Sequence, residues 1–475
     1  MEIACKVYNE ELYYQFEKEN NINNNQKNIN KLNNKINLKG IIEPHNINYT
    51  LIDIVSYRGL DNVGATCYMN ATLQCLANIR PITKYLLNPN NYSILFDNKI
   101  SCLMTMEYIQ VLIGLFCNDS RDGSYCPKQF KDEISEYNPL FKGVQANDSK
   151  DLIIFLLEII NNELVQIHNI KQKEKNGNNA EEKILYEQID PSNETKVLKL
   201  FISEYQKTHC SVIGTYLCGF QKSIFLCQNC GCKSINFNIF NFLIFSLEAT
   251  SNYFNLSFNN TIVPIINFDY CFKYLSKEEI FQNTYCQFCN QIGNSNYRDL
   301  LYSMPIYLII ILNRGKGNIF NCNVQIPEKF CPSDYVENDK NDIYNLIGIV
   351  SHFGESGMGG HFIAFCKHSI DGKWRCYNDS IVTECKNDYL QKGTPYILFY
   401  KKQLNNSNNV ISEDNTINSN NIINNQNNNM NNGQQLNIIF NNNYPNMNNN
   451  FQQNMINDNN IYQQNYYNNN MNINH

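Results

Sequence analysis

Residues 59–74 read GLDNVGATCYMNATLQ and join a turn to the start of a helix. The turn contains Asn62 and Gly64, and apolar side chains then recur at helical spacing from Met69 onward. Because glycine permits a tight turn, the side chain three residues after Gly64 is presented at the end of the turn. The pattern predicts a helix over residues 68–87 and places Cys67 at or near its N-terminus.

A cysteine becomes a nucleophile only after its thiol loses the proton, and the partial positive charge of a helix N-terminus favours the thiolate. Most of the 19 cysteines are expected to be small buried apolar residues. Cys67 differs because it combines a helix start with Asn62, whose carboxamide NH₂ can donate to a developing oxyanion. We therefore predict Cys67 as a nucleophile and Asn62 as an oxyanion donor.

The chain changes character near residue 211. Before it, helical patterns cover residues 68–87, 102–116 and 149–164, whereas residues 171–198 are highly polar and are expected to form an exposed loop. Beyond it, short β-branched and aromatic runs predict strands. These runs are SVIGTYLCGF, SIFLC, INFNIFNFLIFSLEA, IYLIIILNR, NLIGIVSHFG, HFIAFCKH, KWRCYND and PYILFYKK. The sequence thus predicts an α+β fold with a helical first third.

Asn-rich tracts flank this segment, including NNQNNNMNNGQQ near the C-terminus. Such tracts contain too few apolar side chains to offset the entropy of an ordered backbone. We expect one catalytic domain over residues 57–402. Residues 1–56 are predicted to form a partly disordered extension, and residues 403–475 a disordered tail.

A catalytic cysteine needs an imidazole that removes the thiol proton and later protonates the leaving group. Of the seven histidines, His361 follows the glycine-rich residues 357–360 and begins the run FIAF. Functional side chains are often presented at such a loop-to-strand junction. At this point a structural role for His361 remains the alternative. We expect His352, on an adjacent strand, to be a positioning residue.

Three segments together resemble the ubiquitin-specific protease family of deubiquitinating enzymes. Residues 59–74 are similar, nearly position for position, to the family's cysteine box G-L-x-N-x-G-[NA]-T-C-Y-M-N-[SA]-x-L-Q. Residues 145–152 resemble its box Q-x-x-D-[AS]-x-E-F, with Asp151 and Leu152 in place of Glu and Phe. Residues 360–382 resemble its histidine box, G-H-[YF]-x-A-[YF] … W-x-x-[FY]-[ND]-D-x-x-V. The similar blocks span residues 58 to 401.

The resemblance implies a papain-like cysteine protease fold with thumb, palm and fingers. The helical first third would be the thumb, residues 205–300 would contribute the fingers, and the remaining strands would form the palm. It also implies that His361 is the catalytic base and that Asn378 is the third catalytic residue, which orients the imidazole. Asp379 is a supporting or alternative partner for that ring, since it would supply the charge that an amide lacks.

The activity that the resemblance implies is thiol-dependent hydrolysis of the isopeptide or peptide bond after the C-terminal glycine of ubiquitin. Ubiquitin and ubiquitinated proteins would be the partners, with acidic residues meeting the arginines of the ubiquitin tail. Two alternatives remain: a hydrolase of a ubiquitin-like modifier, and a catalytically inactive ubiquitin-binding scaffold.

Two C-x-x-C pairs occur in the β-rich region, Cys227 with Cys230 and Cys286 with Cys289. Each pair can present two thiolates to one edge of a tetrahedron, so we predict one structural Zn²⁺. Many members of the resembled family carry a four-cysteine zinc site in the fingers. Cys218 and Cys232 lie near the first pair and leave the ligand set open, and cysteines that merely pack without metal are the alternative.

The net charge is −6, and no basic stripe interleaved with aromatic residues occurs, so we expect no nucleic-acid partner. The longest apolar run, Met304–Leu312, is about half of what a membrane span needs and favours a buried strand. Charges interrupt the first 20 residues where a secretory signal would be apolar. We therefore expect reduced thiols, no membrane contact, a cytoplasmic or nuclear location, and a monomer.

Overall fold

The computed structural model describes residues 42, 47, 58–117, 123–176, 190–208, 210–256, 263–315, 320–338, 341–354, 359–385 and 393–403. All of them belong to one of the two compact units into which the chain divides. The predicted extension and tail lie outside the described residues, apart from Ile42, Ile47 and Gln403. His45, His209 and His475 lie outside them as well.

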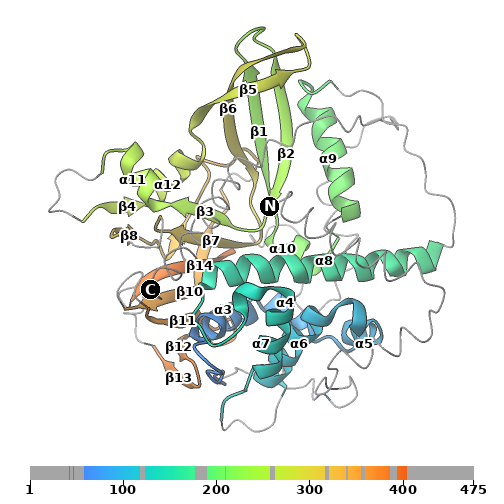
Figure 1. Cartoon of the computed structure of the whole chain (residues 1–475), viewed down its shortest axis with the longest axis vertical. Coiled ribbons are helices and arrows are strands. Elements are labelled where there is room, and N and C mark those ends of the chain that lie inside the picture. Colours follow the sequence, from blue (N-terminus) through green and yellow to red (C-terminus); the bar gives the residue numbers. More distant parts are fainter. Residues whose placement is uncertain are drawn as a thin grey trace, which may run out of the picture. The chain divides into compact units, whose positions relative to one another are not determined.

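Helices fill the first third of the described chain, as predicted (Figure 1). None of the helices described here is long and apolar enough to cross a bilayer. The helices of this part are α3 (Cys67–Ala77), α4 (Arg80–Leu86), α5 (Pro89–Asp97), α6 (Leu103–Phe116), α7 (Lys128–Tyr137), α8 (Ser149–Asn176) and α9 (Glu194–Thr208), with 3₁₀ turns η3 (Lys99–Ser101) and η4 (Pro139–Phe141).

Two predicted boundaries in this part are wrong. The helix predicted over residues 68–87 is two helices, because α3 ends at its C-cap Asn78 and a proline occupies the first turn of α4. The polar loop predicted over residues 171–198 is helical at both ends, since α8 continues to Asn176 and α9 begins at Glu194. Lys, Gln and Glu are good helix formers, and they extend α8 without an apolar face.

An antiparallel four-stranded sheet, a mixed eight-stranded sheet and a small parallel pair follow. One sheet has four strands in the order β2-β1-β6-β5; the other has eight, in the order β13-β12-β11-β10-β14-β7-β3 with β9 beside β10, and β3 pairs with β7 in parallel. The strands are β1 (Gly219–Cys227), β2 (Lys233–Phe240), β3 (Leu243–Ser246), β4 (Ile265–Asn267), β5 (Glu278–Cys286), β6 (Gln291–Ser303), β7 (Tyr307–Asn313), β8 (Asn323–Gln325), β9 (Lys329–Phe330), β10 (Tyr344–Phe353), β11 (His361–Lys367), β12 (Trp374–Asn378), β13 (Ile381–Glu384) and β14 (Thr394–Lys402).

Three short helices interrupt the predicted β region: α10 (Val212–Leu217), α11 (Leu247–Tyr253) and α12 (Phe268–Leu275). The strand predicted for SVIGTYLCGF is therefore wrong over α10. The Ser211 side chain accepts a hydrogen bond from the Gly214 N–H at 2.9 Å and caps this helix. Packing of α10 against α8 and α4 then outweighs the β preference of its residues.

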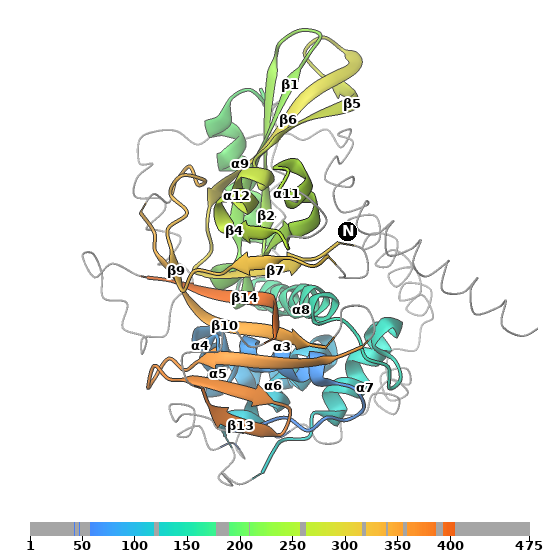
Figure 2. The same cartoon turned by 90° about the vertical axis from the view of Figure 1, so that its left-hand side faces the viewer.

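The eight-stranded sheet carries the core and supports the thiol-bearing helix. Strand β7 is buried along nearly its whole length, as predicted for the longest apolar run. Helix α3 packs against β10, β11 and β12, and every residue of α3 is buried (Figure 2). The first and last parts of the chain therefore meet at α3.

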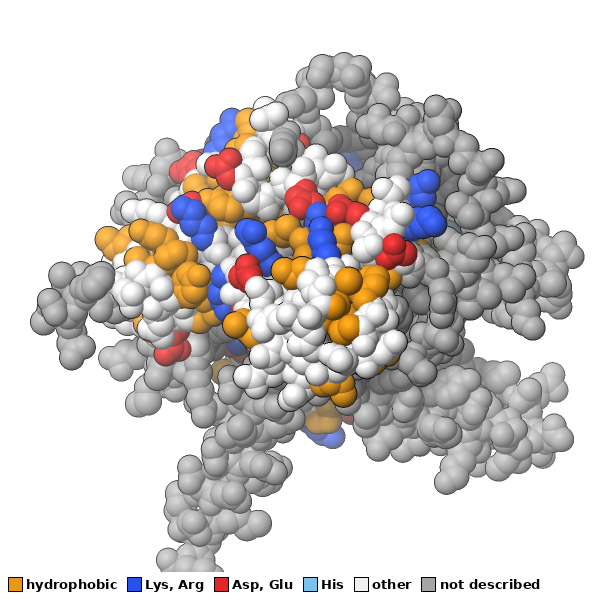
Figure 3. Space-filling model, turned by 90° about the horizontal axis from the view of Figure 1, so that it is seen from above, with side chains coloured by type: hydrophobic (Ala, Val, Ile, Leu, Met, Phe, Trp, Pro, Cys, Tyr) orange, Lys and Arg blue, Asp and Glu red, His pale blue; other side chains and the backbone are white. Residues whose placement is uncertain are grey.

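One face of the four-stranded sheet is only partly covered. Helix α9 packs against β2, where Phe237 joins an apolar cluster with Leu198. Farther along the same face, Leu226 and Ile280 both pair with Asn296 and remain exposed. Figure 3 views this end of the molecule and shows hydrophobic side chains among charged ones of both signs.

Candidate active site and metal site

The turn before α3 is closed by the side chain of Asn62. Its Oδ1 accepts hydrogen bonds from the Gly64 N–H at 3.2 Å and from the Thr66 N–H at 3.0 Å. Gly64 has φ +118°, a conformation that residues with a Cβ rarely adopt. The chain then enters α3 with Cys67 as its first residue. The structure thus presents the thiol at a helix start, where the sequence predicts it.

The surroundings of Cys67 act on its thiol in opposite directions. Burial raises its pKa above the ordinary value, and the charge of Asp379 adds to that effect. The N–H groups of Phe362, Tyr68 and Cys67 itself act against this, because they donate to the sulfur. Burial has the largest effect, so the pKa of the thiol lies above its ordinary value.

His361 begins β11, and the N–H of the next residue, Phe362, donates to the Cys67 sulfur. Its Nε2 lies 2.6 Å from Asn378 Oδ1. Because that oxygen can only accept, Nε2 must carry the proton, and Nδ1 keeps its lone pair. This tautomer is the one that a general base requires.

Asp379 lies at the same hairpin and touches the turn before α3. Its Oδ2 is 3.9 Å from His361 Nε2 and accepts a hydrogen bond from Asn62 Nδ2 at 2.9 Å. A Cβ on Gly59 would lie 2.4 Å from the Asp379 carbonyl oxygen, so only glycine allows this close approach. One N–H of Asn62 is thus used by Asp379, and an amide NH₂ has a second.

The structure also places Asn70 beside Asp379, although the sequence did not indicate Asn70 as a site residue. Its Nδ2 donates to Asp379 Oδ1 at 2.8 Å and to the carbonyl oxygens of Asp61 at 3.1 Å and Leu60 at 3.2 Å. Its position three residues after Cys67, one helical turn along α3, is the sequence signal that could have suggested it.

Two carboxylates lie at the N-terminal end of α8. Asp148 Oδ2 accepts a hydrogen bond from the Tyr396 hydroxyl at 2.6 Å. Burial, followed by the charge of Asp148, raises the pKa of Asp151 to about 6. Asp148 also acts electrostatically on His352, whose ring lies 4.8 Å from that of Phe362. An acidic, partly buried pair therefore lies close to the strand that carries His361.

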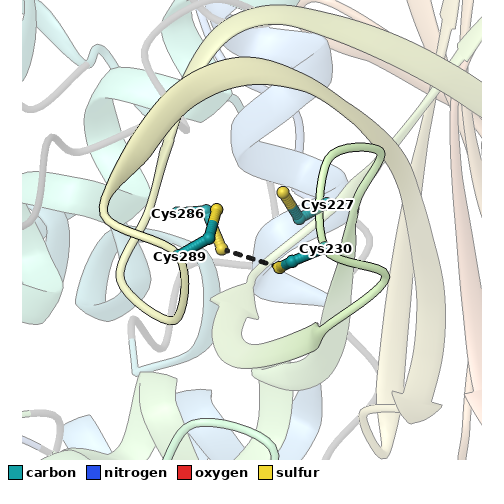
Figure 4. A group of neighbouring side chains, drawn as sticks. All are labelled: Cys227, Cys230, Cys286 and Cys289. Carbon is teal, nitrogen blue, oxygen red and sulfur yellow. Dashed lines mark hydrogen bonds between the residues drawn. The ribbon is translucent and has the colours of Figure 1, made fainter.

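The four cysteines of the two C-x-x-C pairs come together at the ends of β1 and β5 (Figure 4). Their sulfur atoms all lie within 4.8 Å of one another, and Cys230 Sγ is 3.6 Å from Cys286 Sγ. Tetrahedral zinc with Zn–S bonds of ~2.3 Å requires sulfurs about 3.8 Å apart. The cluster can therefore hold a metal ion.

Two features of the cluster bear on the ligand set. Hydrogen bonding from the Cys230 N–H lowers the pKa of Cys227 and favours its thiolate, whereas burial raises the pKa of Cys289 in the same cluster. Cys218 donates its S–H to Asn241 Oδ1 at 2.7 Å, and among the residues that the structure describes neither it nor Cys232 belongs to the cluster.

A buried thiol at a helix start, with an amide-held imidazole on the adjoining strand, is an arrangement that can support nucleophilic catalysis by cysteine. Comparison with models of protein families matches residues 58–400 to the family "Ubiquitin carboxyl-terminal hydrolase". The chain belongs to this family.

Similar curated proteins include ubiquitin carboxyl-terminal hydrolase 2 of Bos taurus, 27% identical over 353 residues, which cover 72% of this chain and 54% of that protein. Ubiquitin carboxyl-terminal hydrolase 21 of Mus musculus is 24% identical over 373 residues, covering 74% and 63%. The chain thus spans about half the length of hydrolase 2.

Among solved structures, the fold is similar to a chain of the SAGA Ubp8/Sgf11/Sus1/Sgf73 DUB module bound to ubiquitin aldehyde, with a TM-score of 0.51, 19% identity and coverage of 76% of this chain and 72% of that one. A chain of the module bound to monoubiquitin gives a TM-score of 0.52 at 20% identity, covering 80% and 76%. The expected α+β, papain-like fold is confirmed. The residues expected to form the fingers, 205–300, contribute the four-stranded sheet, although β6 continues to Ser303 and β3 belongs to the eight-stranded sheet.

Proposed function

We propose that this chain is a deubiquitinating thiol protease that hydrolyses the bond after the C-terminal glycine of ubiquitin. One observation carries the proposal: His361 Nε2 lies 2.6 Å from Asn378 Oδ1, and the N–H of the next residue, Phe362, lowers the pKa of the Cys67 thiol. Family membership and the ubiquitin aldehyde bound to the similar structure support ubiquitin as the substrate.

In the first step, His361 Nδ1 takes the proton of the Cys67 thiol, and the thiolate attacks the carbonyl carbon of the terminal glycine. Burial disfavours a thiolate in the resting site, so proton transfer to the imidazole accompanies the attack. Asn378 favours this transfer because it holds the tautomer that leaves Nδ1 free to accept.

The carbonyl oxygen becomes an oxyanion as the bond to sulfur forms. The N–H groups at the start of α3 point toward the sulfur, and the second N–H of Asn62 is the candidate side-chain donor. The imidazolium of His361 then protonates the leaving lysine amine as the C–N bond breaks. Water, activated by the same ring, hydrolyses the remaining thioester and restores the thiol.

The acidic pair at the start of α8 is the proposed contact for the ubiquitin tail. Asp148 and Asp151 place two carboxyl groups near His352 and Tyr396, and the Asp151 carboxyl gains a proton easily, with a pKa of about 6. An arginine of the tail would favour the charged form of both and replace the repulsion between them with ion pairs.

We further propose that the four-cysteine cluster holds Zn²⁺. The cysteine-only donor set and the sulfur spacing favour zinc over harder divalent ions, which prefer oxygen. The ion would hold the ends of β1 and β5 together, far from the reacting bond in the sequence, and so serves structure.

The test uses the full chain and ubiquitin that carries a C-terminal electrophile. The wild type should form one covalent adduct by intact mass, and Cys67→Ala should form none while it still binds ubiquitin. Cys331→Ala is the matched control, because Cys331 is an exposed thiol with no catalytic role and its loss should leave the adduct unchanged.

Three outcomes would contradict the proposal. Persistence of the adduct in Cys67→Ala overturns the assignment of the nucleophile. Ubiquitin binding without an adduct in the wild type favours an inactive scaffold. Faster reaction with a ubiquitin-like modifier that carries the same electrophile would make that modifier, rather than ubiquitin, the substrate.

A further inference from the structure

The Asn70 side chain connects three parts of the site without touching the reacting atoms. The residue is 2% exposed and lies on α3. Its Nδ2 contacts Asp379, from the β12–β13 hairpin, and the carbonyl oxygens of Leu60 and Asp61, which precede Asn62. One amide therefore joins the helix, the turn before it and the hairpin that follows Asn378.

The orientation of this amide is fixed by chemistry. All three neighbours of Nδ2 are acceptors, so the reversed amide would place an oxygen against three oxygens. The Asn70 Oδ1 is buried and has no hydrogen-bond partner among the described residues. A buried acceptor without a partner costs about 1–3 kcal/mol. Asn70 is therefore a poor residue for filling a core. Its role must come from the hydrogen bonds that Nδ2 donates.

The donor side acts on Asp379. The Asp379 carboxylate is held by Asn70 at one oxygen and by Asn62 at the other, and the second oxygen faces His361 at 3.9 Å. Asp379 also has φ +49°, a strained backbone conformation that persists only where the surroundings enforce it. Loss of Asn70 would leave Asn62 as the one side-chain amide described as donating to this carboxylate.

We propose that Asn70 is a positioning residue for the hydrolysis proposed above: it fixes the Asp379 carboxylate and the Leu60–Asp61 backbone, and so holds Asn62 and His361 in place. The proposal rests on the proposed function, because it assigns Asn62 and His361 their roles. It adds a residue whose effect reaches the reaction only through others.

Asn78 provides a matched control on the same helix. Its Nδ2 also bridges α3 to the sheet, donating to Ile347 O and Lys367 O at 3.1 Å each. It lies eleven residues beyond Cys67, or about 16 Å along the helix axis. The two asparagines thus make the same kind of helix-to-sheet contact, but only Asn70 contacts Asp379.

The principal experiment compares Asn70→Asp with Asn78→Asp from pH 6 to pH 8.5. Two rates are measured for each chain: kcat on a fluorogenic ubiquitin amide, and alkylation of Cys67 by iodoacetamide, followed on the Cys67 peptide by mass spectrometry. In Asn70→Asp, the new carboxylate lies next to Asp379, and two carboxylates at such a distance share one proton.

That proton replaces the N–H that Asn70 donates to Asp379 as long as it is bound, while the hydrogen bonds to the Leu60 and Asp61 carbonyl oxygens are lost at every pH. The ratio of each Asn70→Asp rate to wild type should therefore be at least about tenfold lower at pH 8.5 than at pH 6, as a second charge appears near the thiol. Asn78→Asp should give a constant ratio to wild type. A constant ratio for Asn70→Asp, or the same decline in Asn78→Asp, overturns the proposal.

Asn70→Ala tests the same point if Asn70→Asp fails to fold. We expect kcat to fall about 10- to 100-fold at pH 7 with KM within about threefold, because the ubiquitin-binding surfaces are unchanged. Asn78→Ala should change neither. A rise in KM with unchanged kcat, or equal effects of the two alanine variants, contradicts a positioning role.

The alkylation arm separates the two proposals. If the wild type cleaves no ubiquitin amide, the proposed function fails, and the pH-dependent ratio of Cys67 alkylation rates still decides whether Asn70 controls the site. If the wild type is active and that ratio is constant, only the role of Asn70 is overturned.

Discussion

At the level of single residues, the Cys67 sulfur lies between two competing influences. Helix-start N–H groups favour a thiolate, but burial and the nearby Asp379 carboxylate disfavour it more strongly. The pKa of the Cys67 thiol therefore lies above its ordinary value, which disfavours a preformed thiolate. The reactivity of this thiol must depend on pH accordingly.

We predict that Cys67 alkylation by iodoacetamide rises about tenfold per pH unit from pH 6 to pH 9. The sign follows from the raised pKa of the thiol, because the thiolate fraction grows with pH throughout that range. Peptide-resolved mass spectrometry gives the rate at Cys67 separately from the other cysteines. A rate that is already constant below pH 7 would show a thiolate-imidazolium pair instead.

The two candidate partners of His361 differ in distance and in charge. Asn378 Oδ1 lies at 2.6 Å and Asp379 Oδ2 at 3.9 Å from Nε2. We predict that Asn378→Ala lowers kcat about 100-fold, whereas Asp379→Asn lowers it about 10-fold, because the shorter contact sets the tautomer. Steady-state kinetics on a fluorogenic ubiquitin amide measures both. The opposite order would make Asp379 the orienting residue.

At the level of elements, sequence patterns predict most strands of the β-rich half correctly and one segment wrongly. The apolar run of β7 and the runs of β10, β11, β12 and β14 are strands as predicted. Helix α10 is not, because a Ser211 cap and tertiary packing override the strand preference of Val212 and its neighbours. Capping and packing depend on partners that a local pattern does not contain.

Glu163 of α8 caps the start of a neighbouring helix, α6. It accepts hydrogen bonds from the Met104 N–H at 3.1 Å and from the Thr105 N–H at 2.7 Å. Burial nevertheless raises its pKa to about 7, above the value in the unfolded chain. The proton is therefore bound more tightly in the folded state, and this contribution to stability is lost as pH rises through 7.

We predict that Glu163→Gln removes the loss of stability that the Glu163 carboxyl causes as pH rises. Relative to wild type, its free energy of unfolding should increase by about 1–3 kcal/mol between pH 5 and pH 8. Denaturant titrations at the two pH values provide the measurement, and Glu136→Gln, at an exposed position of α7, serves as the control. An unchanged difference between variant and wild type would show that Glu163 does not titrate in this range.

The metal site is an element-level feature because it ties β1 to β5. We predict one zinc per chain by atomic absorption, and a lower melting temperature after removal by a chelator, because the binding energy of a structural metal is folding energy. Cys289→Ser should reproduce both effects, whereas Cys331→Ser should not. Purified wild-type chain without metal and with unchanged melting would indicate cysteines that merely pack.

At the level of the whole molecule, sequence blocks suffice to predict the thiol, the imidazole and the cysteine pairs, because each prediction depends on residues close together in the chain. The hydrogen bonds that Asn70 and Asn62 donate to Asp379 could not be predicted in this way. Asn70 and Asp379 are 309 residues apart, and their contact exists only because α3 packs on the sheet that ends in the β12–β13 hairpin.

Ile42, which lies before the predicted start of the catalytic domain, is hydrogen-bonded to helices α5 and α6. The Ile42 N–H donates to Gln110 Oε1 at 2.9 Å, and the Tyr92 hydroxyl donates to Ile42 O at 2.5 Å. We predict that a chain of residues 58–403 melts about 3–6 °C below one of residues 42–403, since two hydrogen bonds to buried partners are lost. Calorimetry measures the two melting temperatures, and equal values would place the N-terminal boundary of the folded domain at residue 58.

Strand β14 is the last described strand in sequence, yet it lies in the interior of the eight-stranded sheet, between β10 and β7. The sheet cannot close until residue 402 has been synthesised, 335 residues after Cys67. At ~5–20 residues per second, this takes roughly 20–70 s on the ribosome. During that time the nascent chain carries Cys67 without a completed eight-stranded sheet, and a premature stop before β14 would leave that sheet without one of its interior strands.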